Sequence, residues 1–298
     1  MPSPLTGVTI DEPSRPAAHL DAGAHGSFRG RTERAQLARE LVEQRVTSAT
    51  QEGELQAARA IQLGMVPTPA LLARLDPRIH ASAVLEPARS VGGDFYDAVR
   101  IDADRLLFVI GDVTGKGVPA ALYMALSKTL AKSVLVRESG GLAHAVATLN
   151  RELMREADEA MGVTMLIMLV DCASGAVTMV NAGHENPILL APGQPPKTIP
   201  MQGGPPFCVC DFAYPEERMT LWPGQTLVLI TDGVTEAQDS DGRMFGLNGA
   251  LATLDRPNES DSDGLIAGLV AAVRRFELPT EPSDDLTVLA LRYRGPMR

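Results

Sequence analysis

The sequence predicts an α+β fold in which antiparallel sheets are covered by pairs of helices. Strand-like and helix-like segments occur in groups, in the order β-β-β-α-α-β-β and then β-β-α-α-β. Neighbouring strand-like runs are joined by short turns, at residues 101–105 and 171–175, as in hairpins. A parallel, doubly wound sheet would instead alternate strands with helices, so this order favours antiparallel sheets.

The N-terminal part is expected to have two segments before the main domain. Residues 1–30 are rich in Pro, Gly, Ala and His and show no periodicity, which is typical of a disordered tail. Residues 31–68 form a predicted linker helix, which extends over 31–65, is interrupted near Gly53 and ends before Pro67. A heptad seam through Leu37 and Leu41 has many polar positions, so a stable autonomous coiled coil is not expected. The linker helix then either dimerises weakly, binds a separate regulator or packs on the main domain.

Residues 75–296 are expected to form this main domain. Leu106 to Ile110 is a continuous apolar run, as in a strand that is covered on both faces. The Pro/Gly-rich stretch 192–206 is expected to be a loop. The pattern predicts strands at 82–86, 94–99, 106–110, 164–170, 176–181, 219–222, 226–230 and 286–291, and helices at 118–136, 142–158, 247–253 and 265–276.

Composition excludes several classes of protein. The formal net charge is -10 and the pI is near 5.0, which disfavours general binding to nucleic acid or to anionic membranes. No apolar run is long enough for a membrane span, and residues 1–30 have no signal-peptide pattern. Three cysteines do not make a disulfide framework and fit a reducing compartment. We therefore expect a cytoplasmic protein without nucleic-acid or membrane partners.

Aspartates stand at the ends of four strand-like runs. Asp94 opens one strand and Asp112 closes the next, so the hairpin turn at 101–105 places them at one rim of a sheet. Asp232 follows an apolar strand and Asp284 opens the final strand, so the same rim can collect all four. Carboxylates at this spacing repel one another, and a pair of Mg²⁺ or Mn²⁺ ions removes that cost. The alternative is that each is an ordinary turn aspartate beside a glycine.

The blocks around these aspartates resemble a known family. In order along the chain they are Val91-Gly92-Gly93-Asp94-Phe95-Tyr96-Asp97, Gly111-Asp112-Val113-Thr114-Gly115-Lys116-Gly117, Asn181-Ala182-Gly183-His184, Thr231-Asp232-Gly233-Val234-Thr235-Glu236 and Asp284-Asp285-Leu286-Thr287. They are similar to the SpoIIE-type branch of the metal-dependent (PPM, protein phosphatase 2C-like) serine/threonine phosphatases. The preceding segment, Ala58–Gln62, resembles the linker helix found before this domain, so the resemblance extends from Ala58 to Tyr293.

The resemblance implies a four-layer α-β-β-α sandwich with two Mn²⁺ or Mg²⁺ ions at one rim. It also implies roles for individual residues of the blocks. Asp285 either accepts hydrogen bonds behind the ligands or shares ligation with Asp284. Asp97 is on the opposite face of a regular strand from Asp94 and is not expected to be a ligand. The implied catalytic and metal-binding residues are Asp94, Asp112 as the bridging ligand, Val113 through its carbonyl, Asp232 and Asp284.

Three further residues are candidates for substrate binding. Gly115 and its neighbouring glycine allow a tight turn into a helix, where backbone amides face phosphate, but the spacing does not match a nucleotide P-loop. Lys116 either attracts the substrate or is a solvated lysine. His184 is either a general acid for the leaving oxygen or a structural hydrogen-bonding residue.

The resemblance implies a cytoplasmic protein serine/threonine phosphatase that hydrolyses phosphoserine or phosphothreonine with a metal-activated water. The bacterial branch suggests a phosphorylated anti-sigma-factor antagonist as the substrate, in a partner-switching stress or developmental circuit. One alternative is a catalytically idle partner-binding module of the same fold. Another is a hydrolase of a different phosphoester such as a nucleotide, which the acidic charge and 4% aromatic content disfavour.

Overall fold

The computed structural model describes residues 22–137, 139–156, 161–255 and 262–296. The chain divides into two compact units, Met1–Gly53 and Glu54–Arg298. The first helix, α1 (Ala22–Met65), begins before residue 31, so the tail predicted for 1–30 is wrong over 22–30, and its first 21 residues lie outside the described ones. No proline follows Pro16 until Pro67, so nothing sterically prevents the helix from extending toward the N-terminus.

The break predicted near Gly53 is also absent, because α1 includes this residue. A glycine costs a helix only about 1 kcal/mol relative to alanine, and good helix formers stand on both sides of it. Pro67 follows the end of α1, as predicted, but Pro69 then opens a short helix, α2 (Pro69–Leu72), where its missing N–H has no helical partner to lose.

The strands of the second unit form two antiparallel five-stranded sheets. The β1 sheet has the order β1 (Ile79–Glu86), β10 (Leu286–Tyr293), β9 (Thr226–Ile230), β6 (Ile188–Leu190) and β7 (Lys197–Thr198). The β2 sheet has the order β2 (Phe95–Arg100), β3 (Arg105–Val113), β4 (Val163–Asp171), β5 (Ala176–Ala182) and β8 (Glu217–Thr220).

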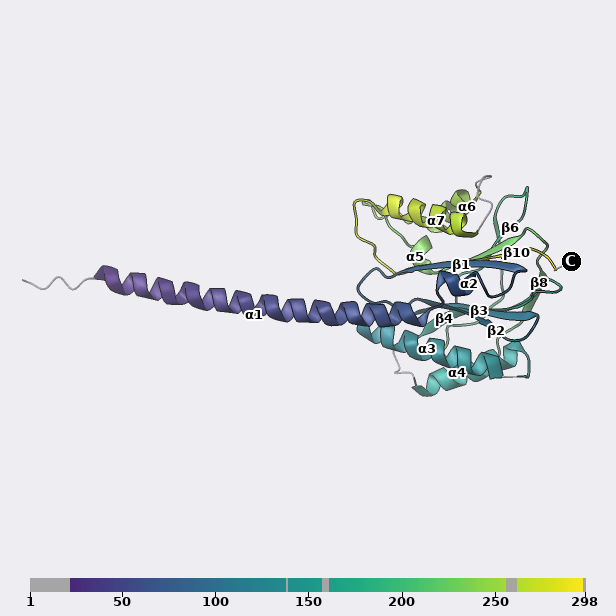
Figure 1. The fold of residues 1–298 in the computed structure, drawn as a ribbon, viewed down its shortest axis with the longest axis horizontal. Helices are drawn as coiled ribbons and strands as arrows, with labels where there is room; N and C mark the ends of the chain where they lie inside the picture. Colours follow the sequence, from purple (N-terminus) through teal and green to yellow (C-terminus); the bar gives the residue numbers. More distant parts are fainter. Residues whose placement is uncertain (1–21, 138, 157–160, 256–261, 297–298) are drawn as a thin grey trace, which may run out of the picture. The chain divides into compact units, whose positions relative to one another are not determined.

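Helices cover the outer faces of both sheets. Figure 1 shows α3 (Val118–Arg137) and α4 (Leu142–Glu156) beside the β2 sheet, and α6 (Gly246–Leu254) and α7 (Ser262–Glu277) beside the β1 sheet. The predicted four-layer α-β-β-α sandwich of the α+β class is therefore confirmed. Among the helices in the described part of the chain, none has the length and apolar character needed to span a bilayer.

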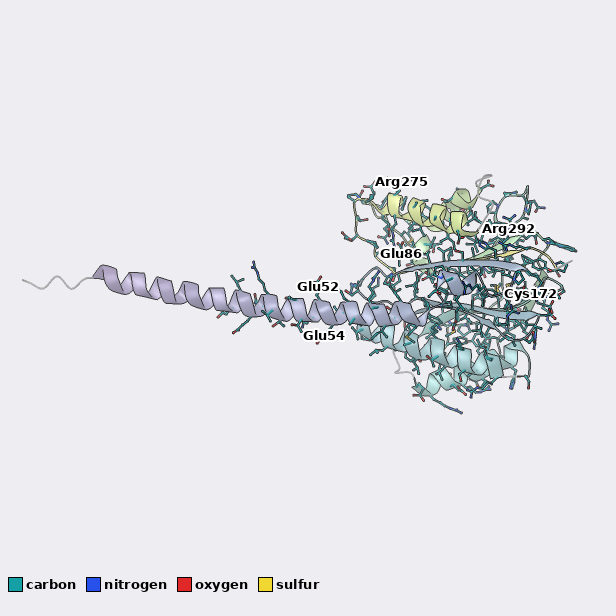
Figure 2. The ribbon with its side chains drawn as sticks, viewed as in Figure 1. Glu52, Glu54, Glu86, Cys172, Arg275 and Arg292 are labelled. Carbon is teal, nitrogen blue, oxygen red and sulfur yellow. The ribbon has the colours of Figure 1, made fainter. Side chains whose placement is uncertain are left out.

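The apolar strands are buried on both faces. In β9, Leu227 and Leu229 join the large cluster that includes side chains of the β2 sheet, whereas Val228 and Ile230 join a second cluster with α6 and α7. The large cluster also contains Cys172, which is fully buried. This residue, labelled in Figure 2, directly follows β4. Burial on both faces explains why the strand sequences are continuously apolar rather than alternating.

Some short elements differ from the sequence prediction. The strands β6 and β7 flank or interrupt the stretch predicted as loop, and β8 lies two residues earlier than predicted. The single-turn helix α5 (Asp232–Thr235) was not predicted. Elements this short contain no full period of apolar residues, so the pattern has little to detect.

The register of the strands brings the ends of four strands together. In the β2–β3 hairpin Phe95 is paired with Gly111, so Asp94 and Asp112 are the next two opposing residues. In the β9–β10 pair Ile230 is opposite Val288, which brings the residues that follow β9 beside those that precede β10. Each sheet therefore contributes one pair of acidic strand ends.

Candidate metal centre

Asp94 and Asp112 are buried together at the end of the β2 sheet. The side chain of Asp94 is 1% exposed. A hydrogen bond between the carboxyl groups of Asp94 and Asp112 lowers the pKa of Asp112 but does not offset its burial. The hairpin therefore brings these two residues together, as predicted.

The β1 sheet brings Asp232 and Asp284 to the same place. Asp232 is the first residue of α5, directly after β9, and Asp284 lies just before β10. Their charges act on the other pair: repulsion from Asp232 and, more weakly, from Asp284 raises the pKa of Asp112. The four aspartates, which we call the acidic rim, thus come from both sheets.

Burial and like charge make it unfavourable to ionise the carboxyl groups of the acidic rim when no cation is bound. Desolvation is the largest cause that raises the pKa of Asp112, to about 7, and of Asp232, to about 6. The pKa of Asp94 also lies well above its usual value, first because of burial and then because of Asp112 and Asp285. Three carboxyl groups that resist ionisation in one place are typical of a site that receives positive charge.

We expect the metal-free protein to be more stable near pH 6 than near pH 8. In the unfolded chain Asp112 has already lost its proton at pH 6, whereas in the folded chain its pKa is about 7. Between these pH values the folded state binds more protons than the unfolded state, so stability falls as the pH rises, by about 1 kcal/mol from this group.

Urea unfolding in EDTA at both pH values measures this effect. The Asp112→Asn variant should lose that part of the pH dependence. Identical pH dependence in the wild type and the variant would contradict a raised pKa at Asp112.

Two threonines that sequence reasoning missed hold Asp94. The hydroxyl groups of Thr231 and Thr287 donate to Asp94 Oδ2 at 2.7 and 2.6 Å. The Thr287 amide also donates to Thr231 Oγ1 at 3.0 Å. Both threonines belong to the blocks that carry the family resemblance, next to Asp232 and near Asp284, and that position is the signal that could have found them.

Both carboxylate oxygens of Asp285 accept hydrogen bonds from backbone amides. Its Oδ1 accepts from the amide of Ala88 at 2.8 Å and its Oδ2 from the amide of Gly93 at 2.7 Å. The side chain is buried, whereas the carboxylate of Asp284 is 36% exposed. This geometry favours Asp284 over Asp285 as the residue that is available to a cation.

Lys116 faces the acidic rim. Its Nζ lies 2.9 Å from Asp284 Oδ2 and donates to the carbonyl of Ser283 at 2.6 Å. Gly115 and Gly117 have φ angles of 100° and 77°, and they turn the chain from β3 into α3. The turn between strand and helix is therefore as predicted, and it gives Lys116 a carboxylate partner in addition to any substrate role.

A cavity of about 310 Å³ adjoins the acidic rim and contains the predicted histidine. It is lined by Asp112, Thr164, Gly183, His184, Glu185, Asp232 and Glu236. His184 Nδ1 lies 2.9 Å from Thr164 Oγ1, and burial lowers the pKa of His184 to about 4. The imidazole is therefore neutral at neutral pH, which favours a hydrogen-bonding role over that of a protonated acid. The cavity also adds Glu185, Glu236 and Thr164, which were not predicted.

Asp97 does not face the acidic rim. Its carboxylate pairs with Lys128 Nζ of α3 at 2.5 Å, and both side chains are buried. This ion pair fastens α3 to β2 and agrees with the expectation that Asp97 is not a ligand.

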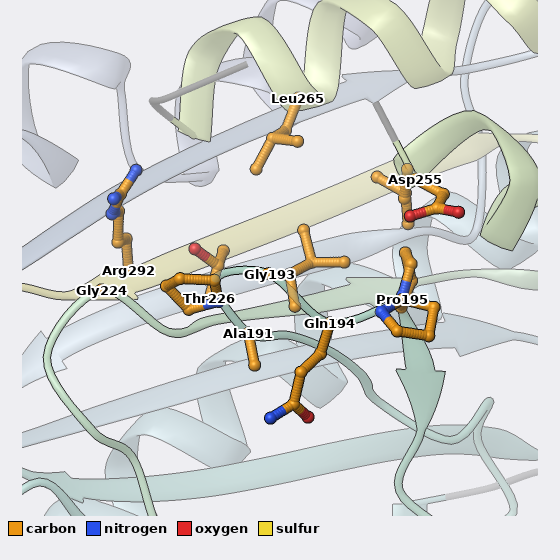
Figure 3. Close-up of a pocket in the computed structure, with 13 residues that line it drawn as sticks. Ala191, Gly193, Gln194, Pro195, Gly224, Thr226, Asp255, Leu265 and Arg292 are labelled. Atoms are coloured by element: carbon orange, nitrogen blue, oxygen red, sulfur yellow. The ribbon is translucent and has the colours of Figure 1, made fainter. Parts of the chain in front are cut away.

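A larger cavity, of about 650 Å³, has none of the four acidic-rim aspartates in its lining (Figure 3). It is lined by the segment Leu190–Pro196 together with residues of the β1 sheet and of α6 and α7, including Asp255, Leu265 and Arg292. Size alone does not identify the functional site, because this cavity has no cluster of acidic groups among the described residues that line it.

The donor set of the acidic rim fits a hard divalent cation. Its side chains offer carboxylate oxygens, which Mn²⁺ and Mg²⁺ prefer. A Cβ on Gly93 would lie 2.5 Å from the Val113 carbonyl oxygen and 3.1 Å from Asp112 Oδ1. The absence of a side chain at Gly93 therefore leaves room beside both oxygens. Within the described residues, no three His, Cys, Asp or Glu side chains already stand in a geometry that holds an ion.

The chain is similar to one family model and to two curated proteins. The model of the family described as Stage II sporulation protein E (SpoIIE) matches residues 102–294. Protein IcfG of Synechocystis is 31% identical over 72% of this chain and 37% of its own length. Phosphoserine phosphatase RsbU of Bacillus subtilis is 30% identical over 54% of this chain and 48% of its own length. The chain thus spans less than half the length of these relatives.

Solved structures share the fold. The PP2C domain of SiaA from Pseudomonas aeruginosa has a TM-score of 0.72 at 23% identity and covers 83% of this chain and 98% of its own. The catalytic domain of the serine/threonine phosphatase PstP, solved with two manganese ions, has a TM-score of 0.51 at 16% identity, over 72% of this chain and 97% of its own. With a family model that matches most of the sequence and a PP2C-like sandwich, the chain belongs to the SpoIIE-type branch of the PPM phosphatase family.

Proposed function

We propose that this chain is a Mn²⁺- or Mg²⁺-dependent protein phosphatase that hydrolyses phosphoserine or phosphothreonine. The observation that carries the proposal is the acidic rim, where two sheets bring buried carboxyl groups together at the cost of raised pKa values for Asp94, Asp112 and Asp232. Two cations bound there would supply positive charge for the phosphoryl oxygens and an activated water.

The residues take different parts in this proposal. Asp112 would hold both cations, because it lies between Asp94 of its own sheet and Asp232 of the other. Asp94, Asp232, Asp284 and the Val113 carbonyl would supply the other ligands. Thr231 and Thr287 hold Asp94 in place, and Asp285 fixes the Gly93 segment rather than binding a cation.

The relatives support the activity and the metal. RsbU is a phosphoserine phosphatase, the PstP structure contains two manganese ions, and RsbX was solved with magnesium. We propose residues 75–296 as the phosphatase domain, since the family match lies inside these bounds. We propose residues 31–68 as a dimerisation or regulatory segment.

The substrate that this proposal favours is a phosphorylated anti-sigma-factor antagonist in a cytoplasmic partner-switching circuit. Its support is the similarity to RsbU and to a solved protein that combines RsbU and RsbW domains.

Phosphate release from phosphoserine and phosphothreonine peptides, with Mn²⁺, with Mg²⁺ and with EDTA, tests the proposed activity. We expect release that depends on the added metal and little release from ATP. A protein that binds Mn²⁺ yet releases phosphate from none of these compounds would instead be a partner-binding module.

A further inference from the structure

A buried glutamine of α1 is bonded to the backbone that precedes the acidic rim. Gln62 is 4% exposed. Its Nε2 donates to the Gly92 carbonyl at 2.6 Å, and its Oε1 accepts from the Gly92 amide at 3.2 Å. One side-chain amide thus satisfies both polar groups of one residue, two positions before Asp94.

The other side of the same segment is held by Asp285. Gly93 donates its amide to Asp285 Oδ2 at 2.7 Å. A Cβ on Gly92 would lie 1.7 Å from that oxygen, so the segment passes the carboxylate at a distance that only glycine allows. Gly92 and Gly93 are therefore fixed between Gln62 and Asp285.

Two further contacts join the same helix end to this region. Arg59 Nη1 donates to the Arg89 carbonyl at 3.0 Å, and the Tyr96 hydroxyl donates to the Pro67 carbonyl at 2.8 Å. These contacts lie on either side of the Gln62 pair along the chain. The end of α1 and the residues just after it therefore pack against the segment that leads into Asp94.

The glycine segment needs such support because it leads directly into Asp94. The carboxyl group of Asp94 is hydrogen-bonded to that of Asp112, whereas two consecutive glycines form the most deformable backbone available. Without hydrogen bonds that fix the Gly92 backbone, this segment is free to shift and to move the carboxyl group of Asp94 away from Asp112.

We propose that Gln62 is a positioning residue of the metal centre, which holds the Gly92 backbone so that Asp94 stays where it shares a cation with Asp112. This inference rests on the proposed function. It assigns to α1 a direct contribution to cation affinity, through hydrogen bonds to one glycine.

The Gln62→Met variant tests this proposal, because methionine has a similar length but can neither donate nor accept as an amide does. Gln56→Met is the matched control, since Gln56 is an exposed glutamine of the same helix. The readouts are Mn²⁺ binding to the metal-free proteins by calorimetry, the Mn²⁺ concentration for half-maximal phosphate release, and the KM for the phosphopeptide.

We expect Gln62→Met to bind Mn²⁺ about ten-fold more weakly, as for the loss of one to two hydrogen bonds. The turnover at saturating Mn²⁺ and the KM should remain near the wild-type values, and Gln56→Met should match the wild type throughout. A merely structural role would lower the melting temperature and leave Mn²⁺ affinity unchanged, and that result would overturn the proposal.

A second variant tests the proposal if the first does not fold, and the wild type separates this inference from the proposed function. If Gln62→Met does not fold, Gln62→Asn retains an amide on a shorter side chain and should show an intermediate affinity; wild-type affinity in folded Gln62→Asn would equally overturn the proposal. If the wild type itself binds no Mn²⁺, the proposed function fails and this inference with it. If the wild type and Gln62→Met bind Mn²⁺ equally, only the inference fails.

Discussion

Replacement of Asp112 by asparagine is expected to abolish Mn²⁺-dependent phosphate release, with kcat/KM lower by more than about a thousand-fold, or ~4 kcal/mol of transition-state stabilisation. The physical reason is its position. The pKa of Asp112 is raised first by burial and then by carboxylates of the opposite sheet, while Asp112 contacts Asp94 of its own sheet. Asparagine keeps the shape but removes the charge that two cations would share.

The same variant should fold at least as well as the wild type when no metal is present. It relieves repulsion in a buried cluster, so its free energy of unfolding in EDTA should be equal or higher at neutral pH. Asp211→Asn, at an exposed aspartate outside the acidic rim, is the control and should keep full activity. Phosphate release by Asp112→Asn near the wild-type rate would refute the assignment of the metal centre.

Replacement of Asp285 by alanine is expected to lower the free energy of unfolding by about 2 kcal/mol. The change leaves the buried amide of Gly93 and the partly buried amide of Ala88 without their acceptor, and a buried amide without a partner costs about 1–3 kcal/mol. Relief of the repulsion that Asp285 exerts on Asp94 offsets part of this cost. Urea unfolding in EDTA measures the net effect.

Asp284→Ala is the matched control at the neighbouring position. Its partly exposed carboxylate pairs with the exposed Lys116 and accepts from the adjacent amide of Asp285, and an exposed ion pair contributes little to stability. We expect Asp284→Ala to change stability by less than about 0.5 kcal/mol but to lose Mn²⁺-dependent activity. Equal loss of stability in the two variants would contradict the separate roles that the geometry gives them.

The longer strands and helices could be predicted because the pattern of apolar residues follows the faces that become buried. Leu227 to Ile230 is continuously apolar because its side chains alternate between two buried clusters. The α3 helix was predicted to within a residue of its observed bounds. In contrast, β6 and β7 have only three and two residues, too few for any period.

The acidic rim could be predicted from strand ends, whereas its supporting contacts could not. Hairpin pairing alone places Asp94 opposite Asp112, because the turn between them is short. The hydroxyl groups of Thr231 and Thr287 reach Asp94 from positions 137 and 193 residues away. The resemblance blocks mark both threonines as candidates, but no local pattern encodes which residue they contact, because that depends on how one sheet packs on the other.

The Gln62 contact has the same origin. Its partner Gly92 is 30 residues away, beyond the end of α1 and across β1. The sequence places Gln62 in the segment that resembles the family's linker helix, but it gives no sign that this polar side chain is buried. Its burial becomes visible only when the helix end and the glycine segment are placed against each other.

A crystal structure of the protein grown with MnCl₂, with anomalous differences collected at the manganese edge, tests the central claim most directly. We predict two manganese peaks at the acidic rim, with Asp112 bound to both and Asp94, Asp232 and Asp284 each bound to at least one. Absence of manganese from this rim in crystals that contain the ion, or peaks only elsewhere on the molecule, would contradict the account.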